Sequence, residues 1–202
     1  MHAAHAAVRA TEVFGLRPLM PAVRQCLDGI FGDGLVPRSK WGPSSLRILR
    51  PHISLPLWLG RRPPDGKVLI YQLPNRVVAP PEAGYSVRIT YALDFRGRRM
   101  TYDSHVGTDF AVPPGTVVVA PAAGVVRVVA KQMQRGGLQV LIDHGDGLAC
   151  TLAHLSRALV RPGQSVARGE PVALSGMSGV DGVLFFPWLA PHVHMNVLLD
   201  GV

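Results

Sequence analysis

Turn residues divide the second half of the chain into short apolar segments, and this spacing restricts the fold more than any other feature of the sequence. The pair Asp146-Gly147 lies between two such segments and favours a two-residue hairpin turn. A chain with 22 Gly and 18 Pro suits many strands joined by turns better than a helical bundle. The sequence therefore predicts a mainly β fold, an antiparallel and sandwich-like sheet. Strands are expected at Thr116–Ala120, Val125–Ala130, Leu138–Asp143, Leu148–Leu155, Ser165–Ala167, Pro171–Leu174 and His192–Leu199.

The first eighty residues follow a different pattern. Apolar residues recur every three or four positions over about residues 18–31, which predicts one amphipathic helix. Residues 35–46 are typical of a linker. The prolines between 74 and 81 favour a boundary, so we expect a basic N-terminal segment of unknown role at 1–80 and one domain at 81–202. Short apolar runs around that boundary predict further strands at Leu46–Leu49, Ile53–Leu59, Val68–Leu73 and Tyr85–Leu93.

Positive charge is concentrated in the first half of the chain. Residues 1–104 hold 15 Lys and Arg against 7 Asp and Glu, whereas residues 105–202 hold 6 of each kind. Such a bias is compatible with a polyanionic surface partner. The simpler interpretation is a solvated arginine-rich surface, because no motif that interleaves aromatic and basic residues accompanies the charge. Nucleic-acid binding is therefore not expected.

Composition excludes several classes of protein. Apolar residues make up 48% of the chain and charged residues 17%, which supports a packed core. No apolar run reaches the roughly 18 residues of a transmembrane helix, and the N-terminus lacks the apolar stretch of an export signal. This predicts a soluble chain, cytoplasmic by default. The two cysteines, Cys26 and Cys150, are too few for a disulfide framework and are expected as buried thiols.

Two histidine motifs predict a metal site. His105 and Asp109 are four residues apart, and on extended backbone both side chains project from the same face. His192 and His194 are two residues apart in an expected strand, which again places both on one face. Either motif alone is weak. Together they offer two imidazoles and one carboxylate, with a fourth position open, as in catalytic zinc sites.

The frame around these motifs resembles a known family. H-x-G-x-D at 105–109 is followed by G-T-V-V-V-A-P-A-A-G-V-V, H-G-D-G, A-H-L-S, G-Q-S-V-A-R-G-E, S-G-M-S-G and P-H-V-H. Over about residues 85–199 this order is similar to the lysostaphin/LytM-type zinc peptidases, peptidase family M23. The resemblance implies that His105, Asp109 and His194 bind one zinc ion per chain. It also implies that His154 and His192 are the catalytic pair.

The implied function is that of a zinc-dependent metalloendopeptidase acting on peptidoglycan cross-linking peptides. In this chemistry a zinc-bound water attacks the peptide carbonyl, and imidazoles transfer the protons because the chain has no H-E-x-x-H motif. The sequence does not divide these tasks between His154 and His192. The resemblance further implies a location in the cell envelope or outside the cell, and another short segment after Val202.

Two other functions are less consistent with the sequence. A biotinyl- or lipoyl-type carrier fails because none of Lys40, Lys67 and Lys131 follows the second glycine-rich motif. A non-catalytic wall-binding or amidase-activating module is disfavoured because all five site positions are filled. His144 is expected to be structural, and the insert Val180–Ala190 is interpreted either as a lid over the substrate groove or as part of the core.

Overall fold

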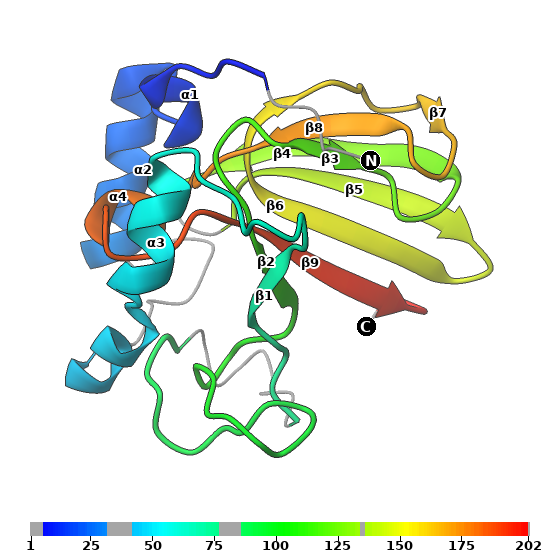
Figure 1. Ribbon diagram of the computed structural model, residues 1–202. Helices are drawn as coiled ribbons and strands as arrows, with labels where there is room; N and C mark the ends of the chain where they lie inside the picture. The colour runs from blue at the N-terminus through cyan, green and yellow to red at the C-terminus, as the bar shows by residue number, and fades with distance from the viewer. Residues whose placement is uncertain (1–5, 32–41, 77–85, 134–135, 202) are drawn as a thin grey trace.

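An antiparallel sheet organises the second half of the protein (Figure 1). The computed structural model describes residues 6–31, 42–76, 86–133 and 136–201. Within them the sheet has nine strands, in the order β1-β2-β9-β6-β5-β4-β7, with β8 paired to β6 and β3 to β8. The strands are β1 (Leu69–Gln72), β2 (Thr108–Ala111), β3 (Val117–Val119), β4 (Gly124–Gln132), β5 (Gly137–Gly145), β6 (Leu148–Ala158), β7 (Ser165–Val166), β8 (Pro171–Ser175) and β9 (His192–Leu199).

The predicted fold class is confirmed. Each strand expected beyond Gly107 overlaps one in the structure, and the described strands all pair in antiparallel fashion. The turn between β5 and β6 contains Asp146 and Gly147 at φ 51° and 76°. Two successive positive φ values characterise the hairpin turn that this dipeptide favours. The strand β2, which carries Asp109, was not among the predicted strands.

Helices gather at one end of the sheet (Figure 1). They are α1 (Ala10–Val13), α2 (Leu19–Phe31), the 3-10 helix η1 (Pro43–Ile48), α3 (Pro51–Trp58) and α4 (Val180–Leu184). The predicted helix at 18–31 is confirmed as α2. Of the predicted linker 35–46, residues 35–41 lie outside the described residues and the remainder overlaps η1. No helix among the described residues is long and apolar enough to cross a membrane.

Three of the four strands predicted before residue 94 are wrong. Leu46–Leu49 overlaps η1, and Ile53–Leu59 overlaps α3. Each of these helices has a proline in its first turn, where the fixed φ and missing N–H are tolerated. Residues 86–93, the described part of the third run, form only isolated bridges. An apolar run of four to eight residues suits a buried helical turn as well as a strand, so periodicity does not distinguish them. The fourth run, Val68–Leu73, is confirmed as β1.

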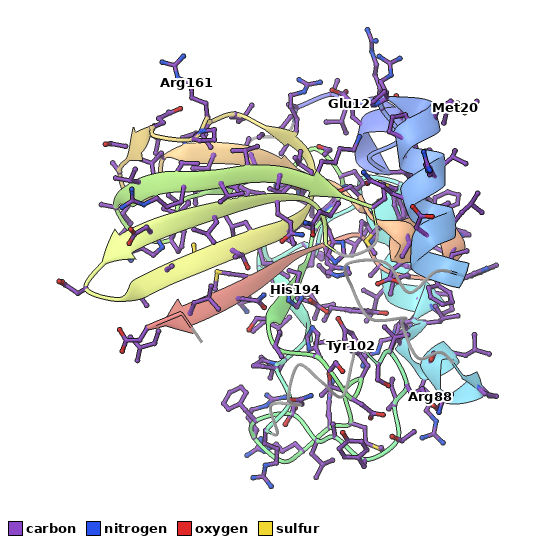
Figure 2. The ribbon with its side chains drawn as sticks, turned by 180° about the vertical axis from the view of Figure 1, so that it is seen from behind. Glu12, Met20, Arg88, Tyr102, Arg161 and His194 are labelled. Carbon is purple, nitrogen blue, oxygen red and sulfur yellow. The ribbon has the colours of Figure 1, made fainter. Side chains whose placement is uncertain are left out.

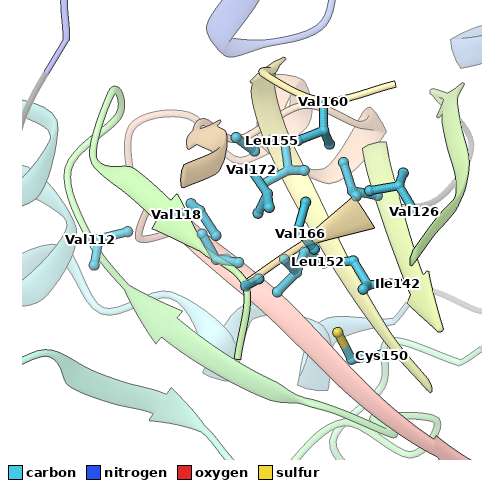
Figure 3. Close-up of a cluster of buried hydrophobic side chains, with 14 residues drawn as sticks. Val112, Val118, Val126, Ile142, Cys150, Leu152, Leu155, Val160, Val166 and Val172 are labelled. Carbon is cyan, nitrogen blue, oxygen red and sulfur yellow. The ribbon is translucent and has the colours of Figure 1, made fainter. Parts of the chain in front are cut away.

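Two apolar clusters hold the protein together. The first lies within the sheet and includes the fully buried Val126, Val140, Ile142, Leu155 and Val172 (Figure 3). The second joins the helices to the sheet, and its members come from both halves of the chain. They are Val13, Ile48, Leu57, Tyr71, Ile89, Ala111, Met177, Leu189 and Ala190. The basic N-terminal segment is therefore packed against the sheet, while the domain boundary expected at 80/81 stays a prediction.

The two cysteine thiols are free. Cys150 is buried in the sheet core, as expected, and Cys26 on α2 is only partly buried. Burial raises the pKa of Cys150 to about 11. These thiols therefore act as apolar groups rather than as nucleophiles.

Candidate active site

Strand pairing brings the predicted metal ligands together. In the antiparallel pair of β2 and β9, Asp109 lies opposite His194 and Ala111 lies opposite His192. The same strand β9 pairs with β6, where Ala153 lies opposite His194. His105 precedes β2 by three residues, and His154 follows Ala153. Residues separated by up to 89 positions in the sequence therefore meet on three neighbouring strands.

His105, Asp109 and His194 form a compact group of ligand atoms. Nε2 of His105 lies 3.1 Å from Oδ2 of Asp109, and Nδ1 of His194 lies 2.6 Å from Oδ1 of Asp109. The three ligand atoms lie within 4.8 Å of one another. Nε2 of His105 is buried without a hydrogen-bond partner. A buried donor set of two imidazoles and one carboxylate, with one ring nitrogen unsatisfied, fits a divalent metal ion.

Hydrogen bonds outside this group fix which ring nitrogens face inward. Nδ1 of His105 donates to the carbonyl oxygen of Leu73 at 2.9 Å, and Nε2 of His194 donates to Oδ1 of Asn196 at 2.7 Å. The carbonyl oxygen of Leu73 and Oδ1 of Asn196 accept, so each places a proton on the nitrogen facing it. The Asp109 carboxylate likewise accepts from Nδ1 of His194, and a bound cation would take the place of that proton. The remaining nitrogens, Nε2 of His105 and Nδ1 of His194, face Asp109, as such outer contacts commonly arrange for metal-binding histidines.

Electrostatics couple these three side chains. Burial alone would raise the pKa of Asp109, but the neighbouring His105 and His192 together hold it well below its usual value. Burial alone would lower the pKa of His194, yet the hydrogen bond and charge of Asp109 outweigh burial and raise it. Asp109 is therefore an ionised carboxylate inside the protein, which is the form that binds a cation.

His154 and His192 lie side by side next to the group. Their ring centroids are 4.7 Å apart. Nδ1 of His154 donates to the carbonyl oxygen of Ser178, and Nδ1 of His192 donates to that of Ala190, both at 2.8 Å. Burial lowers the pKa of His154 to about 3 and also lowers that of His192. Both rings are thus neutral at neutral pH, with Nε2 available as a proton acceptor.

Two backbone features near these side chains show that the arrangement is tightly constrained. His154 has a φ of 59°, in the left-handed region that a non-glycine residue seldom adopts, and such strain concentrates at functional sites. A Cβ atom at Gly107 would lie 2.5 Å from Nε2 of His194 and 2.2 Å from Oδ1 of Asn196. Gly107 therefore leaves the space that His194 and Asn196 occupy.

Side chains from outside the predicted motifs enclose the site. The Tyr71 ring stacks against His192 at 6.1 Å between centroids, and Tyr102 meets the edge of His105 at 4.5 Å. Figure 2 shows Tyr102 close to His194, below the sheet. The cavity beside His154 and His192 has a volume of about 20 Å³, enough for roughly one water molecule.

Sequence reasoning missed several residues that shape the site. Asn196 was detectable, because it stands two positions after His194 and a strand places such residues on one face. Tyr71, Leu73 and Ser178 gave no such signal, since their positions depend on how distant elements pack. Of the other histidines, His52 is exposed on α3, and His2 and His5 lie outside the described residues.

His144 is structural, as expected. Its Nδ1 donates to the carbonyl oxygen of Ala123 at 2.9 Å, and its Nε2 lies 3.2 Å from Sγ of Cys150. The insert predicted as a lid or core segment contains α4. Val180, Leu189 and Ala190 of this insert are buried, whereas Phe186 and Trp188 are about half exposed. The ends of the insert thus belong to the core, and the mobility of its middle stays a prediction.

Several known proteins are similar in sequence to this chain. The profile of peptidase family M23 matches residues 103–202. An uncharacterized metalloprotease of Haemophilus influenzae is 40% identical over 97 residues, which are 48% of this chain and 19% of that protein. The peptidoglycan DD-endopeptidase ShyA of Vibrio cholerae is 40% identical over 98 residues, which are 48% of this chain and 21% of that protein.

The solved structures that are similar to this chain include the catalytic domain of lysostaphin from Staphylococcus simulans. It is 28% identical, with a TM-score of 0.43, over 49% of this chain and 70% of that chain. The present chain spans about a fifth of the length of the two curated relatives above. The family profile covers the region that carries all five site residues, and the chain therefore belongs, through residues 103–202, to peptidase family M23.

Proposed function

We propose that the protein is a zinc-dependent metalloendopeptidase that hydrolyses peptide bonds in peptidoglycan cross-linking peptides. The observation that carries this proposal is the juxtaposition of three metal-ligand atoms with two neutral imidazoles in one buried site. The substrate class is supported by the relative in Vibrio cholerae, which is named as a peptidoglycan DD-endopeptidase. A peptidoglycan substrate supports a location in the cell envelope or outside the cell.

His105, Asp109 and His194 would hold the zinc ion through Nε2, a carboxylate oxygen and Nδ1. When bound, zinc supplies Lewis-acid chemistry, since it polarises a peptide carbonyl and makes a water molecule more acidic. The protein keeps the three ligands ready for the ion. Leu73 and Asn196 hold the two imidazoles in the required tautomers, and burial excludes competing water.

His154 and His192 would carry out the proton transfers. Because their Nδ1 atoms are held by carbonyl oxygens, both rings present Nε2 for exchange with the reacting groups. One ring accepts a proton from the attacking water, and the protonated form of a ring can stabilise the oxyanion or protonate the leaving amine. Burial lowers the pKa of both rings, so that each is unprotonated at neutral pH and its Nε2 is free to accept.

Digestion of purified peptidoglycan tests the proposal. The protein should contain about one zinc ion and release peptide fragments with newly formed amino and carboxyl termini, detected by mass spectrometry. Chelation of the metal should stop the release, and added zinc should restore it. Zinc-loaded protein that binds peptidoglycan without cleaving any peptide bond would contradict the proposal and favour a non-catalytic wall-binding module.

A further inference from the structure

A second and larger cavity adjoins the site and is lined by arginines. It has a volume of about 260 Å³ and lies between the outer side of β1 and the loop 94–101. Tyr71 and Gln72 line both this cavity and the small one beside His154 and His192. The larger cavity is therefore separated from the candidate active site by the side chains of a single strand.

Three of the arginines have no anionic partner among the described residues. The Arg50 guanidinium donates one hydrogen bond, from Nη1 to the carbonyl oxygen of Tyr71, and its Cζ lies 4.8 Å from the Tyr71 ring centroid. The exposed side chains of Arg98 and Arg99 form no ion pair with any described residue. These guanidinium groups therefore have N–H donors available to a ligand in the cavity that they line.

The one carboxylate in the cavity wall does not neutralise these arginines. Asp94 accepts hydrogen bonds from the backbone N–H groups of Arg96 and Arg98 and pairs with the Arg96 side chain at 2.9 Å. Its backbone N–H donates to the carbonyl oxygen of Arg99 at 2.7 Å. Asp94 thus holds the loop that carries Arg98 and Arg99. Its carboxylate is already paired with Arg96 and hydrogen-bonded to the loop backbone.

We propose that this arginine-lined cavity is a subsite for a carboxylate of the substrate peptide, so that the protein selects acidic peptides. The inference rests on the proposed peptidase function, because it places the carboxylate next to the scissile bond. Guanidinium groups bind carboxylates through paired hydrogen bonds. A space of this size suits one side chain or chain end rather than a polymer, and Ile70 and Met100 provide apolar contact for its hydrocarbon part.

The carboxylate has two sources in such a peptide, an acidic side chain and the C-terminus. A fluorescein-labelled Ala-Glu-Lys-Ala peptide is the probe, and its Kd is measured by fluorescence anisotropy. The full chain with His154→Ala serves as background, so that the peptide is not consumed. Three further versions carry an amide at the side chain, at the C-terminus or at both.

Arg98→Gln combined with Arg99→Gln is the test variant, because both side chains are exposed and the backbone bonds of the loop are preserved. Arg161→Gln combined with Arg168→Gln removes the same charge, and Figure 2 shows Arg161 on the edge of the sheet far from Tyr102. We expect the test variant to weaken binding of the acidic peptide about tenfold and the control variant to leave it within about twofold. Amidation of both carboxylates should also weaken peptide binding about tenfold when the protein keeps all its arginines. The two singly amidated peptides then identify which carboxylate is bound.

The subsite is refuted if the doubly amidated peptide binds as tightly as the acidic one, or if both arginine variants lose affinity equally. It is also refuted if the acidic peptide does not bind, or if inorganic phosphate displaces it far better than acetate does, which would indicate a phosphate site. Hydrolysis is measured separately on the unsubstituted chain. Selective binding without hydrolysis would overturn the peptidase proposal and leave the carboxylate site standing.

Discussion

The strands from Thr108 onward and the segment before them differ in how they are held. The former are fixed by continuous cross-strand pairing around a core of β-branched side chains, whereas the latter combines short helices and irregular loops packed through one shared cluster. All five candidate site residues belong to residues 105–194. The earlier segment nevertheless contributes the carbonyl oxygen of Leu73, the Tyr71 ring and the arginine-lined cavity. Four of the five candidate site residues therefore come from the strands, and His105 comes from the segment just before β2. The orientation and enclosure of these residues come partly from the irregular region.

The largest effect is expected from the metal ligands. Asp109→Ala or His194→Ala should abolish zinc binding, because each removes one of three protein ligands and Asp109 links the other two. Elemental analysis of the folded variants measures this. Near-stoichiometric zinc in either variant would show that the ligand set is wrong. His144→Ala is the matched control and should retain zinc, since this histidine lies outside the group.

Substitution of the neighbouring histidines should separate chemistry from metal binding. His154→Ala and His192→Ala should retain zinc and lose hydrolysis by about 10²- to 10⁴-fold, the usual loss for a general acid or base. Zinc content and turnover are measured on the same samples. If either substitution removed the metal, that position would have to be reassigned as a ligand.

A smaller effect is expected at Asn196. Asn196→Ala removes the acceptor that holds Nε2 of His194, and loss of such an outer contact typically weakens metal binding about 10- to 100-fold. Competition with a fluorescent chelator gives the affinity. Asn196→Asp keeps an acceptor oxygen and should restore most of the affinity, whereas equal weakening by both variants would argue against the orienting role.

The smallest effect concerns the packing between the two regions. Phe186 makes edge contacts with Phe14 at 5.3 Å and Trp58 at 4.9 Å between centroids, which joins the insert to α1 and α3. Phe186→Ala should lower the free energy of unfolding by about 1–2 kcal/mol, because two aromatic pairs are lost from a half-exposed position. Urea unfolding measures it. Val183→Ala, an exposed position in the same insert, should cost less; a cost equal to that of Phe186→Ala would indicate that the aromatic contacts are unimportant.

Much of the regular region could be predicted from the sequence, and much of the irregular region could not. Apart from β2, the strands beyond Gly107 follow from alternation and turn residues, and the spacing of the two histidine motifs predicted that His105, Asp109 and His194 share one metal site. At 43–58 the short apolar runs suit either a strand or a buried helix, and only packing against the sheet determines which of the two forms. The role of Leu73 was not predictable at all, because a backbone carbonyl carries no sequence signal. The polyanionic contact proposed for the basic half as a whole stays a prediction.

The strand β1 also has a consequence for solubility. It pairs with β2 from Leu69 opposite Ala111, so it covers the backbone groups that β2 would otherwise expose. Uncovered strand edges are templates for pairing with other chains. A fragment beginning at residue 103 would carry every candidate metal ligand and still present this bare edge to its neighbours. Such a fragment would therefore make β2 the edge strand of the sheet, the position that β1 holds in the described chain.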